Sequence, residues 1–473
     1  MKSNLPINIC KYLLFITLNT IGLTQERSQI YPNEYFQIDY RYNQLHDSEN
    51  INFQIRPYYQ RNTSSDSFLY GQLTPIIYLN DGFVDPILSS WLEYQINSNL
   101  TLYNEMIIEE SEDVESSYVG KKWRNISGLT NQSFFYWHKK LFENTHIVTN
   151  IGRFYSQLGP GRTGQLLLSS GSRPLDQISI SLDKIFSKSV VVSLYFQTAM
   201  LDKINSNQRY FSVHRIEVTS GRAHAAISEA ILFSRDEGVD WAYLNPLTFY
   251  YLEQNNGPGL AGNTFFSIEF GYSFQSKHIY SEILIDDFQV DNKTKIDLEP
   301  NEIGMLVGFE YSGESFFFSA EGVGITNRTY KTGDQREWAL HRNLPLGYEI
   351  GSDLGRINML CRVYLDQKWH IDFEGDLIHK GEGGLDVPWD TPWMDDDVTL
   401  VTGYSESFPT GTVEVKSVFS VSAMRHWTRW NWFEIGLSYE NIKNADHFLG
   451  DDESTLTLTT SVAWALDYYL SFK

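Results

Sequence analysis

The feature that most restricts the fold of this chain is an alternation of apolar and polar residues that returns in one short segment after another. In residues 265–275, for example, the apolar Ile268 and Phe270 flank the acidic Glu269. Successive side chains of a β-strand point to opposite faces, so each such segment predicts a strand with one apolar face. The same pattern recurs in residues 189–197, 304–312, 369–377 and 433–440. Helical periodicity is weak and no tandem repeat is evident, so we predict an all-β fold.

Alternation by itself does not decide which face of the strands is buried. A soluble sandwich turns the apolar face inward, whereas a membrane barrel turns it toward lipid and keeps a polar lumen. Two observations favour the barrel. The strands match the about nine to eleven residues of a tilted transmembrane strand, and their polar faces carry many Glu, Asp and Ser residues.

The end of the chain, residues 455–473, is a third observation in favour of a barrel. Its apolar residues share one face: Leu456, Leu458, Val462, Trp464, Leu466, Tyr468, Leu470 and Phe472. This segment resembles the C-terminal strand of bacterial outer-membrane proteins, which closes on an aromatic residue, although Lys473 follows Phe472 here. The alternative is the edge strand of a sandwich. At about 25 residues per strand and connection, we predict a transmembrane antiparallel outer-membrane β-barrel of about 16–18 strands.

The N-terminus predicts export from the cytoplasm. A cationic start precedes an apolar run at residues 12–23, and small residues flank a cleavage point before Gln25. The alternative is a membrane anchor, but the run is shorter than the about 20 apolar residues of a spanning helix. We therefore predict a signal peptide at residues 1–24 and a barrel at residues 25–473, in the outer membrane of a Gram-negative bacterium.

Composition argues against several classes of function. The net charge of -22 opposes a nucleic-acid partner, because phosphates require a basic face. Of the two cysteines, Cys10 lies in the predicted signal peptide, so Cys361 alone forms neither a disulfide within the chain nor a cysteine-rich zinc site. We expect no cofactor and no metal. The sequence has no GxSxG elbow and no convincing Ser/His/Asp set, so an outer-membrane hydrolase is a weaker alternative.

A glycine-rich segment interrupts the strands at residues 152–177, GRFYSQLGPGRTGQLLLSSGSRPLDQ. Glycine allows tight turns and close approach of the main chain to another surface. In one reading, main-chain amides and Arg162 face a ligand. In the other, the loop folds into the lumen and stabilises the barrel. The segment lacks the Lys-Ser/Thr ending of a phosphate-binding loop, and the sequence leaves open whether it lies inside or outside the barrel.

The pieces GPGRTG and RPLDQ of this segment look like a motif region of the capsule-assembly (Wzi-like) outer-membrane family. Similar pieces follow in order: HRIEV (214–218), ISEAILFSR (227–235), YLNPLTFYYLEQ (243–254), EILIDDFQVD (282–291) and HRNLPLGYEIGSD (341–353). The resemblance implies a non-catalytic, lectin-like barrel in outer-membrane lipid that binds capsular polysaccharide or exopolysaccharide and helps attach or assemble it at the cell surface. The family's best-described form has a helical segment that blocks its periplasmic end, whereas residues 25–60 here predict strand and loop.

Four residues are candidates for binding polysaccharide: Arg162, Arg173, Trp389 and Trp393. Arginine makes bidentate contacts to carboxylates, which suits uronic acids. The alternative for the arginines, and for Arg215 and Arg222, is pairing with acids inside the lumen: Glu217, Glu229 or Glu269.

The two tryptophans belong to a predicted surface loop at residues 383–397, where their rings could stack on sugars. The acids of this loop could accept hydroxyl hydrogen bonds, and their spacing does not match an EF-hand calcium loop. The alternative is a solvated acidic loop whose tryptophans lie at the lipid interface.

Two further patterns bear on function. Asp286 and Asp287 are adjacent, so in a strand they point to opposite faces and a strand-end role is preferred to paired catalytic carboxylates. The aromatics of residues 426–432 suggest a membrane girdle. A polar lumen would also suit a porin or substrate-specific channel, which is the main alternative function.

Overall fold

The computed structural model describes residues 67–80, 83–110, 126–187, 190–236, 240–256, 262–289, 293–366, 368–427, 431–463 and 466–472. The predicted signal peptide lies outside these residues, as do Trp464 and Lys473 of the terminal segment.

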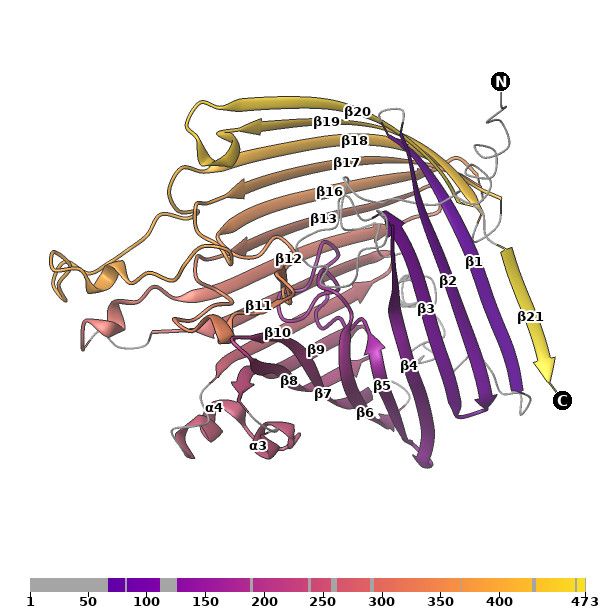
Figure 1. The fold of residues 1–473 in the computed structure, drawn as a ribbon, viewed down its shortest axis with the longest axis horizontal. Coiled ribbons are helices and arrows are strands. Elements are labelled where there is room, and N and C mark those ends of the chain that lie inside the picture. The colour runs from indigo at the N-terminus through magenta and orange to yellow at the C-terminus, as the bar shows by residue number, and fades with distance from the viewer. Residues whose placement is uncertain are drawn as a thin grey trace, which may run out of the picture.

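Nineteen of the described strands form one curved antiparallel sheet (Figure 1). These strands are β1 (Ser67–Asn80), β2 (Phe83–Asn97), β3 (Leu100–Glu110), β4 (Ile126–Phe142), β5 (Thr145–Phe154), β6 (Leu175–Ser187), β7 (Val190–Ile204), β8 (Asn207–Ser220), β9 (Ala223–Arg235), β10 (Asn263–Phe274), β11 (Lys277–Asp287), β12 (Glu302–Ser312), β13 (Phe316–Ile325), β16 (Leu354–Tyr364), β17 (Trp369–Lys380), β18 (Glu414–His426), β19 (Trp432–Lys443), β20 (Asp452–Ala463) and β21 (Leu466–Phe472).

The connections hold a small hairpin and several short helical segments. These are β14 (Leu340–His341) with β15 (Leu344–Pro345), α3 (Trp241–Leu244), α4 (Tyr250–Glu253), η3 (Gln254–Asn256), η4 (Ile296–Leu298), η5 (Gln335–Glu337), η6 (Pro392–Met394) and η7 (Ala445–His447). Within the described residues, no helix is long and apolar enough to cross a membrane.

The sheet returns to its first strand. β1 pairs with β2 on one side and with both β20 and β21 on the other. Leu73 lies opposite Leu466 and Ile76 lies opposite Ala463, so β20 and β21 keep one register along β1. If β20 and β21 are counted as one strand, the sheet has eighteen strands instead of nineteen. The prediction of an antiparallel all-β barrel is confirmed.

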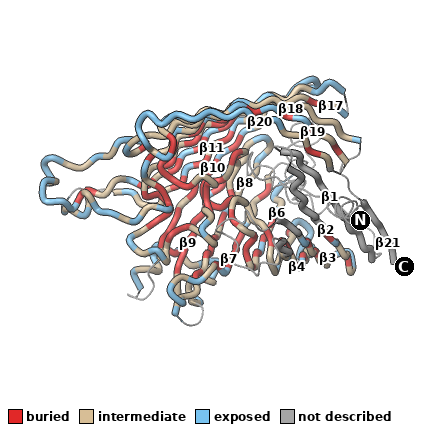
Figure 2. Tube along the Cα trace, turned by 45° about the horizontal axis from the view of Figure 1, so that its top comes forward, coloured by how far each residue is buried: buried red, intermediate tan, exposed pale blue. Residues whose placement is uncertain are grey.

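The polar face of the strands is the buried one. On β10, Ile268 is 48% exposed whereas Glu269 is 2% exposed. On β19, Ile435 is likewise exposed and Glu434 buried. A soluble sandwich would bury the apolar residues instead, so this arrangement is that of a membrane barrel with a polar interior. Figure 2 shows that the buried residues, in red, are frequent on β7, β9, β10 and β11.

The two ends of the barrel carry different connections. At one end the strands are joined by short turns, such as residues 143–144 and 275–276. The other end carries the long connections, among them residues 155–174, 326–353 and 381–413. In bacterial outer-membrane barrels, short turns face the periplasm and long loops face the cell surface. We refer to these as the short-turn end and the long-loop end.

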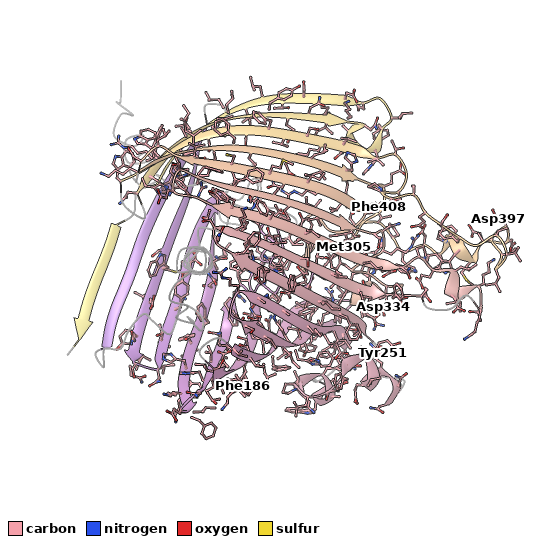
Figure 3. The ribbon with its side chains drawn as sticks, turned by 180° about the vertical axis from the view of Figure 1, so that it is seen from behind. Phe186, Tyr251, Met305, Asp334, Asp397 and Phe408 are labelled. Atoms are coloured by element: carbon pink, nitrogen blue, oxygen red, sulfur yellow. The ribbon has the colours of Figure 1, made fainter. Side chains whose placement is uncertain are left out.

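Aromatic side chains are exposed near the short-turn end: Phe142, Phe186, Phe316, Tyr364 and Trp427. Figure 3 labels Phe186 near the end of its strand, and it labels Asp397 at the tip of the long loop 381–413, well beyond the strands. A ring of aromatics at the membrane interface is typical of these barrels. The girdle suggested by the sequence around residues 426–432 is consistent with the exposure of Trp427.

Candidate functional site

The glycine-rich segment, residues 155–174, packs inside the barrel. Leu166 and Leu168 of this segment are fully buried, and they belong to one hydrophobic core with Leu284 of β11 and Leu306 of β12. Leu284 and Leu306 share the face of the strands that carries the buried acids, which is the inner face. The sequence left open whether this segment lies inside or outside the barrel. In the structure it lies inside.

Two buried glutamates of the wall hold this segment through its main chain. Glu282 on β11 accepts hydrogen bonds from the N–H groups of Leu166 and Leu167, at 3.0 and 3.1 Å. Glu321 on β13 accepts hydrogen bonds from the N–H groups of Arg162 and Thr163, at 2.7 and 2.9 Å. Each carboxylate thus receives two adjacent amides.

These contacts change the first reading of the glycine-rich segment. Its main-chain N–H groups were candidates to face a ligand. In the structure, the N–H groups of residues 162, 163, 166 and 167 instead donate hydrogen bonds to carboxyl groups of the barrel wall. These four buried N–H groups thereby have acceptors, and a buried N–H without an acceptor would cost about 1–3 kcal/mol. The geometry therefore supports the second reading, a loop that stabilises the barrel from within.

A second long connection, residues 326–353, packs against the first. The hydroxyl of Tyr330 donates to the carbonyl of Leu166 at 2.7 Å, and the N–H of Ser169 donates to the carbonyl of Leu346 at 2.8 Å. Gly164 has a φ of +144°, and a Cβ there would lie 3.0 Å from the ring of Tyr348. Glycine is required at this position both by its backbone conformation and by the neighbouring ring.

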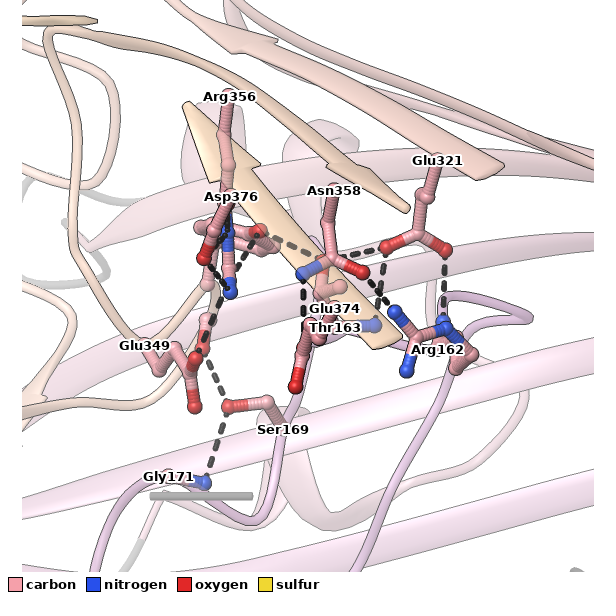
Figure 4. A network of polar contacts seen from close by, with 12 residues as sticks. Arg162, Thr163, Ser169, Gly171, Glu321, Glu349, Arg356, Asn358, Glu374 and Asp376 are labelled. Atoms are coloured by element: carbon pink, nitrogen blue, oxygen red, sulfur yellow. Dashed lines mark hydrogen bonds and ion pairs between the residues drawn. The ribbon is translucent and has the colours of Figure 1, made fainter. Parts of the chain in front are cut away.

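A polar network joins these loops to the wall (Figure 4). Arg356 on β16 makes a bidentate contact to Asp376 on β17, and it also donates to the hydroxyl of Tyr348 at 3.1 Å. Arg162, one of the predicted sugar ligands, reaches the side-chain oxygen of Asn358 on β16. Its guanidinium is therefore engaged by the wall.

Glu349 lies at the edge of the same network, with its carboxylate 3.4 Å from the guanidinium of Arg356. Burial raises the pKa of Glu349 to about 7, although the positive charge of Arg356 lowers it. This carboxyl group in the lumen loops can therefore change its charge near neutral pH.

Arg173, the second predicted arginine, lies close enough to Arg342 for the two charges to interact. The pKa of Arg342, in the β14–β15 turn, is lowered by burial and then by the charges of Arg153 and Arg173. Arg153 on β5 makes a bidentate contact to Asp176 on β6. The charges of Arg153 and Arg173 therefore both act on Arg342, opposed by those of Asp176 and Asp202, and we call Arg153, Arg173 and Arg342 the arginine cluster.

The structure separates Arg215 from Arg222. Arg215 on β8 is buried and makes a bidentate contact to Glu269 on β10, and its Nε lies 3.3 Å from Glu217. Pairing with lumen acids, the alternative for this residue, is confirmed. Arg222 is exposed in the turn between β8 and β9.

Trp389 and Trp393 meet in the loop 381–413 at the long-loop end. Their rings are 6.2 Å apart in an edge-to-face arrangement. The guanidinium of Arg328 lies 5.0 Å from the ring of Trp393 and 5.9 Å from that of Trp389. Trp393 is only 3% exposed, whereas Trp389 is half-buried. Of the two predicted stacking residues, Trp389 is thus the one that presents ring surface.

Sequence reasoning missed Arg328 as the centre of this cluster. Its guanidinium donates to Glu406 at 2.5 Å and to Asp390 at 2.6 Å. These partners are 78 and 62 residues away in sequence, and no local pattern marks Arg328. We call Arg328, Trp389, Asp390, Trp393 and Glu406 the tryptophan cluster.

The remaining acids have structural contacts. Asp286, near the end of β11, accepts the N–H of Tyr330 at 2.5 Å, and Asp287 accepts the N–H of Phe288 at 2.7 Å. The expected strand-end role fits these positions. Over the described part of the chain, no three or more His, Cys, Asp and Glu residues are grouped as a metal site.

Comparisons with known proteins identify the fold. No protein-family model matches the chain, and no curated protein matches it. Among solved structures it is similar to Wzi, described as a carbohydrate-binding β-barrel and outer-membrane protein involved in group 1 capsule assembly in Escherichia coli. The identity is 10%, with 83% of this chain and 84% of Wzi covered and a TM-score of 0.54.

Two other similar structures have lower scores. OccAB4 of Acinetobacter baumannii is 8% identical, with 86% of this chain and 100% of that chain covered and a TM-score of 0.44. OprD of Pseudomonas aeruginosa is 10% identical, with 85% and 95% covered and a TM-score of 0.42. The likeness to Wzi and the buried polar face of the strands make the chain an outer-membrane β-barrel protein of the Gram-negative type, and the 10% identity to Wzi carries no more than the fold.

Proposed function

We propose that this outer-membrane barrel is a non-catalytic protein that binds capsular polysaccharide or exopolysaccharide and helps attach or assemble it at the cell surface. The observation that carries the proposal is the packing of residues 155–174 and 326–353 into a hydrophobic core inside the barrel. A lumen occupied by anchored loops suits a binding protein better than an open channel. The fold shared with Wzi, a carbohydrate-binding barrel, adds support.

The tryptophan cluster is the best candidate surface for a sugar. Its residues lie in two long connections, 326–353 and 381–413, at the end that faces the cell exterior in this class of barrel. Trp389 presents part of its ring, and Asp390 beside it has a side chain that is 71% exposed. An aromatic plane next to a carboxylate combines stacking on the C–H face of a sugar with acceptance of its hydroxyl hydrogens.

Such a surface would bind a single repeat unit weakly. A polymer presents the same repeat many times, so several protein copies in one membrane would engage one chain at once. This mechanism predicts weak binding of an isolated repeat unit and strong retention of long chains. Equal affinity for the repeat unit and for the polymer would contradict it.

The experiment that tests the proposal uses the native host with this gene deleted. Cell-bound and released high-molecular-weight polysaccharide are measured, with the wild-type gene restored as a control. We expect total polymer to stay unchanged and to move into the medium on deletion. Polymer that stays on the cells, together with reduced uptake of a solute, would contradict the proposal and support a channel.

The arginine cluster supports that channel as a second candidate function. The charges of Arg153 and Arg173 both act on Arg342 at the long-loop end, so a small anion that reaches this end would meet positive charge beside the acids Asp176 and Asp202. Conductance of the purified protein in planar bilayers separates the two functions. A binding protein with packed loops should be almost silent, whereas a substrate-specific channel should pass current that anionic solutes block.

A further inference from the structure

The connection between β9 and β10 lies against the outside of the barrel, and we call residues 240–256 the outer flap. It contains α3, α4 and η3 and is drawn beside β8 and β9 in Figure 1. Tyr243 and Tyr250 of the flap are fully buried, and they form a cluster with Ile231 and Phe233 of β9. These two β9 residues alternate with Ala230 and Leu232, which belong to the core inside the barrel. Ile231 and Phe233 therefore point outward, and the flap covers the outer wall.

The flap covers polar groups on that wall. His214 on β8 and Glu229 on β9 lie opposite each other and face outward, with 3.0 Å between Nε2 and Oε2. The N–H of Tyr251 donates to the other oxygen of Glu229 at 2.9 Å. The ring of Tyr250 lies 4.6 Å from that of His214. A polar pair on the lipid side of a barrel is costly unless it is covered, and the flap supplies the cover.

The next row of outward residues toward the short-turn end is aliphatic and uncovered. Leu194, Ile216, Ile227 and Ile268 lie side by side across β7 to β10, and each is 46% to 62% exposed. Two residues along a strand span about 7 Å, so this row begins directly below the covered pair. It is part of the lipid-facing surface of the barrel.

The outward side of the flap is itself apolar. Its large exposed side chains are Trp241, Leu247, Phe249, Tyr251 and Leu252, and the smaller Asn245, Asn255 and Asn256 are exposed beside them. The segment from Trp241 to Leu252, WAYLNPLTFYYL, has no Asp, Glu, Lys or Arg, in a chain with 20% charged residues. The ring of Tyr251 packs edge-to-face on Phe266 of β10, at 6.2 Å. The flap therefore continues the lipid-facing surface rather than interrupting it.

We infer that the outer flap is a lipid-contact element that sits in the outer leaflet of the membrane and covers the His214–Glu229 pair. Its occupant is lipid hydrocarbon, because its apolar side chains continue a row that already faces lipid. Tryptophan and tyrosine suit such a position, since barrels place aromatic residues at the membrane interface. This inference rests on the barrel fold and is independent of the ligand of the long-loop end.

A single-cysteine experiment in liposomes tests this inference. Cys361 is replaced by alanine in the mature chain, and one new cysteine is introduced as Leu247→Cys, Phe270→Cys or Val401→Cys. A fluorescent label on each cysteine is then exposed either to phospholipids that carry a nitroxide quencher or to a water-soluble quencher. Phe270 is an outward residue of β10 that serves as the lipid control. Val401 is 96% exposed in the loop 381–413 and serves as the matched water control for Leu247, which is 84% exposed.

We expect the label at position 247 to lose fluorescence with the lipid quencher as the label at 270 does, and to resist the water-soluble quencher. Quenching like that of the label at 401 would overturn the inference, because the flap would then face water. Protection from both quenchers, with disulfide-linked dimers of Leu247→Cys on oxidation, would also overturn it, because a second copy of the chain would then cover the flap. The change in gel mobility on heating verifies that each variant is folded.

Discussion

The carboxylate of Glu321 accepts a hydrogen bond from the main-chain N–H of Arg162, with 2.7 Å between the two atoms, although the two residues are 159 positions apart in sequence. Glu321 therefore anchors the lumen segment to the wall of the barrel. Glu282 holds the next part of the segment in the same way. Acidic residues inside this barrel thus have a structural role that their number alone would not indicate.

Removal of one anchor should loosen the lumen segment. In Glu321→Ala, the N–H groups of Arg162 and Thr163 lose their acceptor, and a buried unpaired donor costs about 1–3 kcal/mol. We expect the temperature of the gel-mobility change to fall and bilayer conductance to rise. Glu434→Ala is the control, because Glu434 is also a buried wall carboxylate but accepts from Ser461 on the neighbouring strand. Equal effects of the two variants would contradict the anchoring role.

Gly164 provides a test of how tightly the two lumen loops pack. Gly164→Ala places a side chain at a φ of +144° and 3.0 Å from the ring of Tyr348. A strained backbone of this kind costs on the order of 1–3 kcal/mol, so we expect a lower unfolding temperature. At Gly322 a Cβ would meet no atom within 4 Å, and Gly322→Ala is therefore the control and should be nearly neutral. An unchanged unfolding temperature for Gly164→Ala would mean that the loops are not packed in this way.

The barrel itself follows from local sequence, because a side-chain period of two is a property of each strand alone. The apolar Ile268 beside the acidic Glu269 already predicts two unlike faces, and only the burial of Glu269 decides that the polar face is inside. The candidate site could not be predicted in the same way. The bonds from Leu166 to Glu282 and from Arg328 to Asp390 join residues that are 116 and 62 positions apart, so they depend on the closed fold.

The outer flap shows a second limit of sequence reasoning. In the sequence, residues 243–254 are notable only as one motif of the family resemblance. Their apolar residues could not be assigned to a surface of the barrel. In the structure this segment covers a polar pair on the lipid side, with Tyr251 bonded to Glu229. This contact forms because Glu229 points outward from β9. A shift of one residue in the pairing register of β9 would turn this side chain to the inner face of the barrel.

Glu349 should make stability depend on pH. Its pKa is about 4.5 in the unfolded chain and about 7 in the folded protein. The folded state therefore holds the proton more tightly, and the corresponding stability is fully present below pH 4.5 and is lost as pH rises through 7. We expect a loss on the order of 1–3 kcal/mol over this window, measured as the unfolding temperature against pH.

Glu349→Gln is the variant that checks this dependence, because a neutral amide can still accept from Arg356. We expect the fall in stability between pH 4.5 and 7 to become smaller in this variant. Burial also raises the pKa of Glu299 to about 7, so part of the dependence should remain and should become smaller again with the further change Glu299→Gln. A pH profile of Glu349→Gln identical to that of the wild type would mean that folding does not raise the pKa of Glu349.

Substitutions of the two tryptophans at the long-loop end should have different effects. Trp393 is buried and stacks on Arg328, so Trp393→Ala removes packing inside the loop 381–413. We expect this variant to be cut faster by proteinase K within the loop, with the barrel still folded.

Trp389→Ala removes a half-exposed ring, and we expect little change in proteolysis but a shift of polysaccharide from the cells into the medium. Val401→Ala, an exposed apolar change in the same loop, should affect neither measurement. Polysaccharide retained fully by Trp389→Ala would remove this ring from the proposed binding surface and leave the arginine cluster as the next region to test.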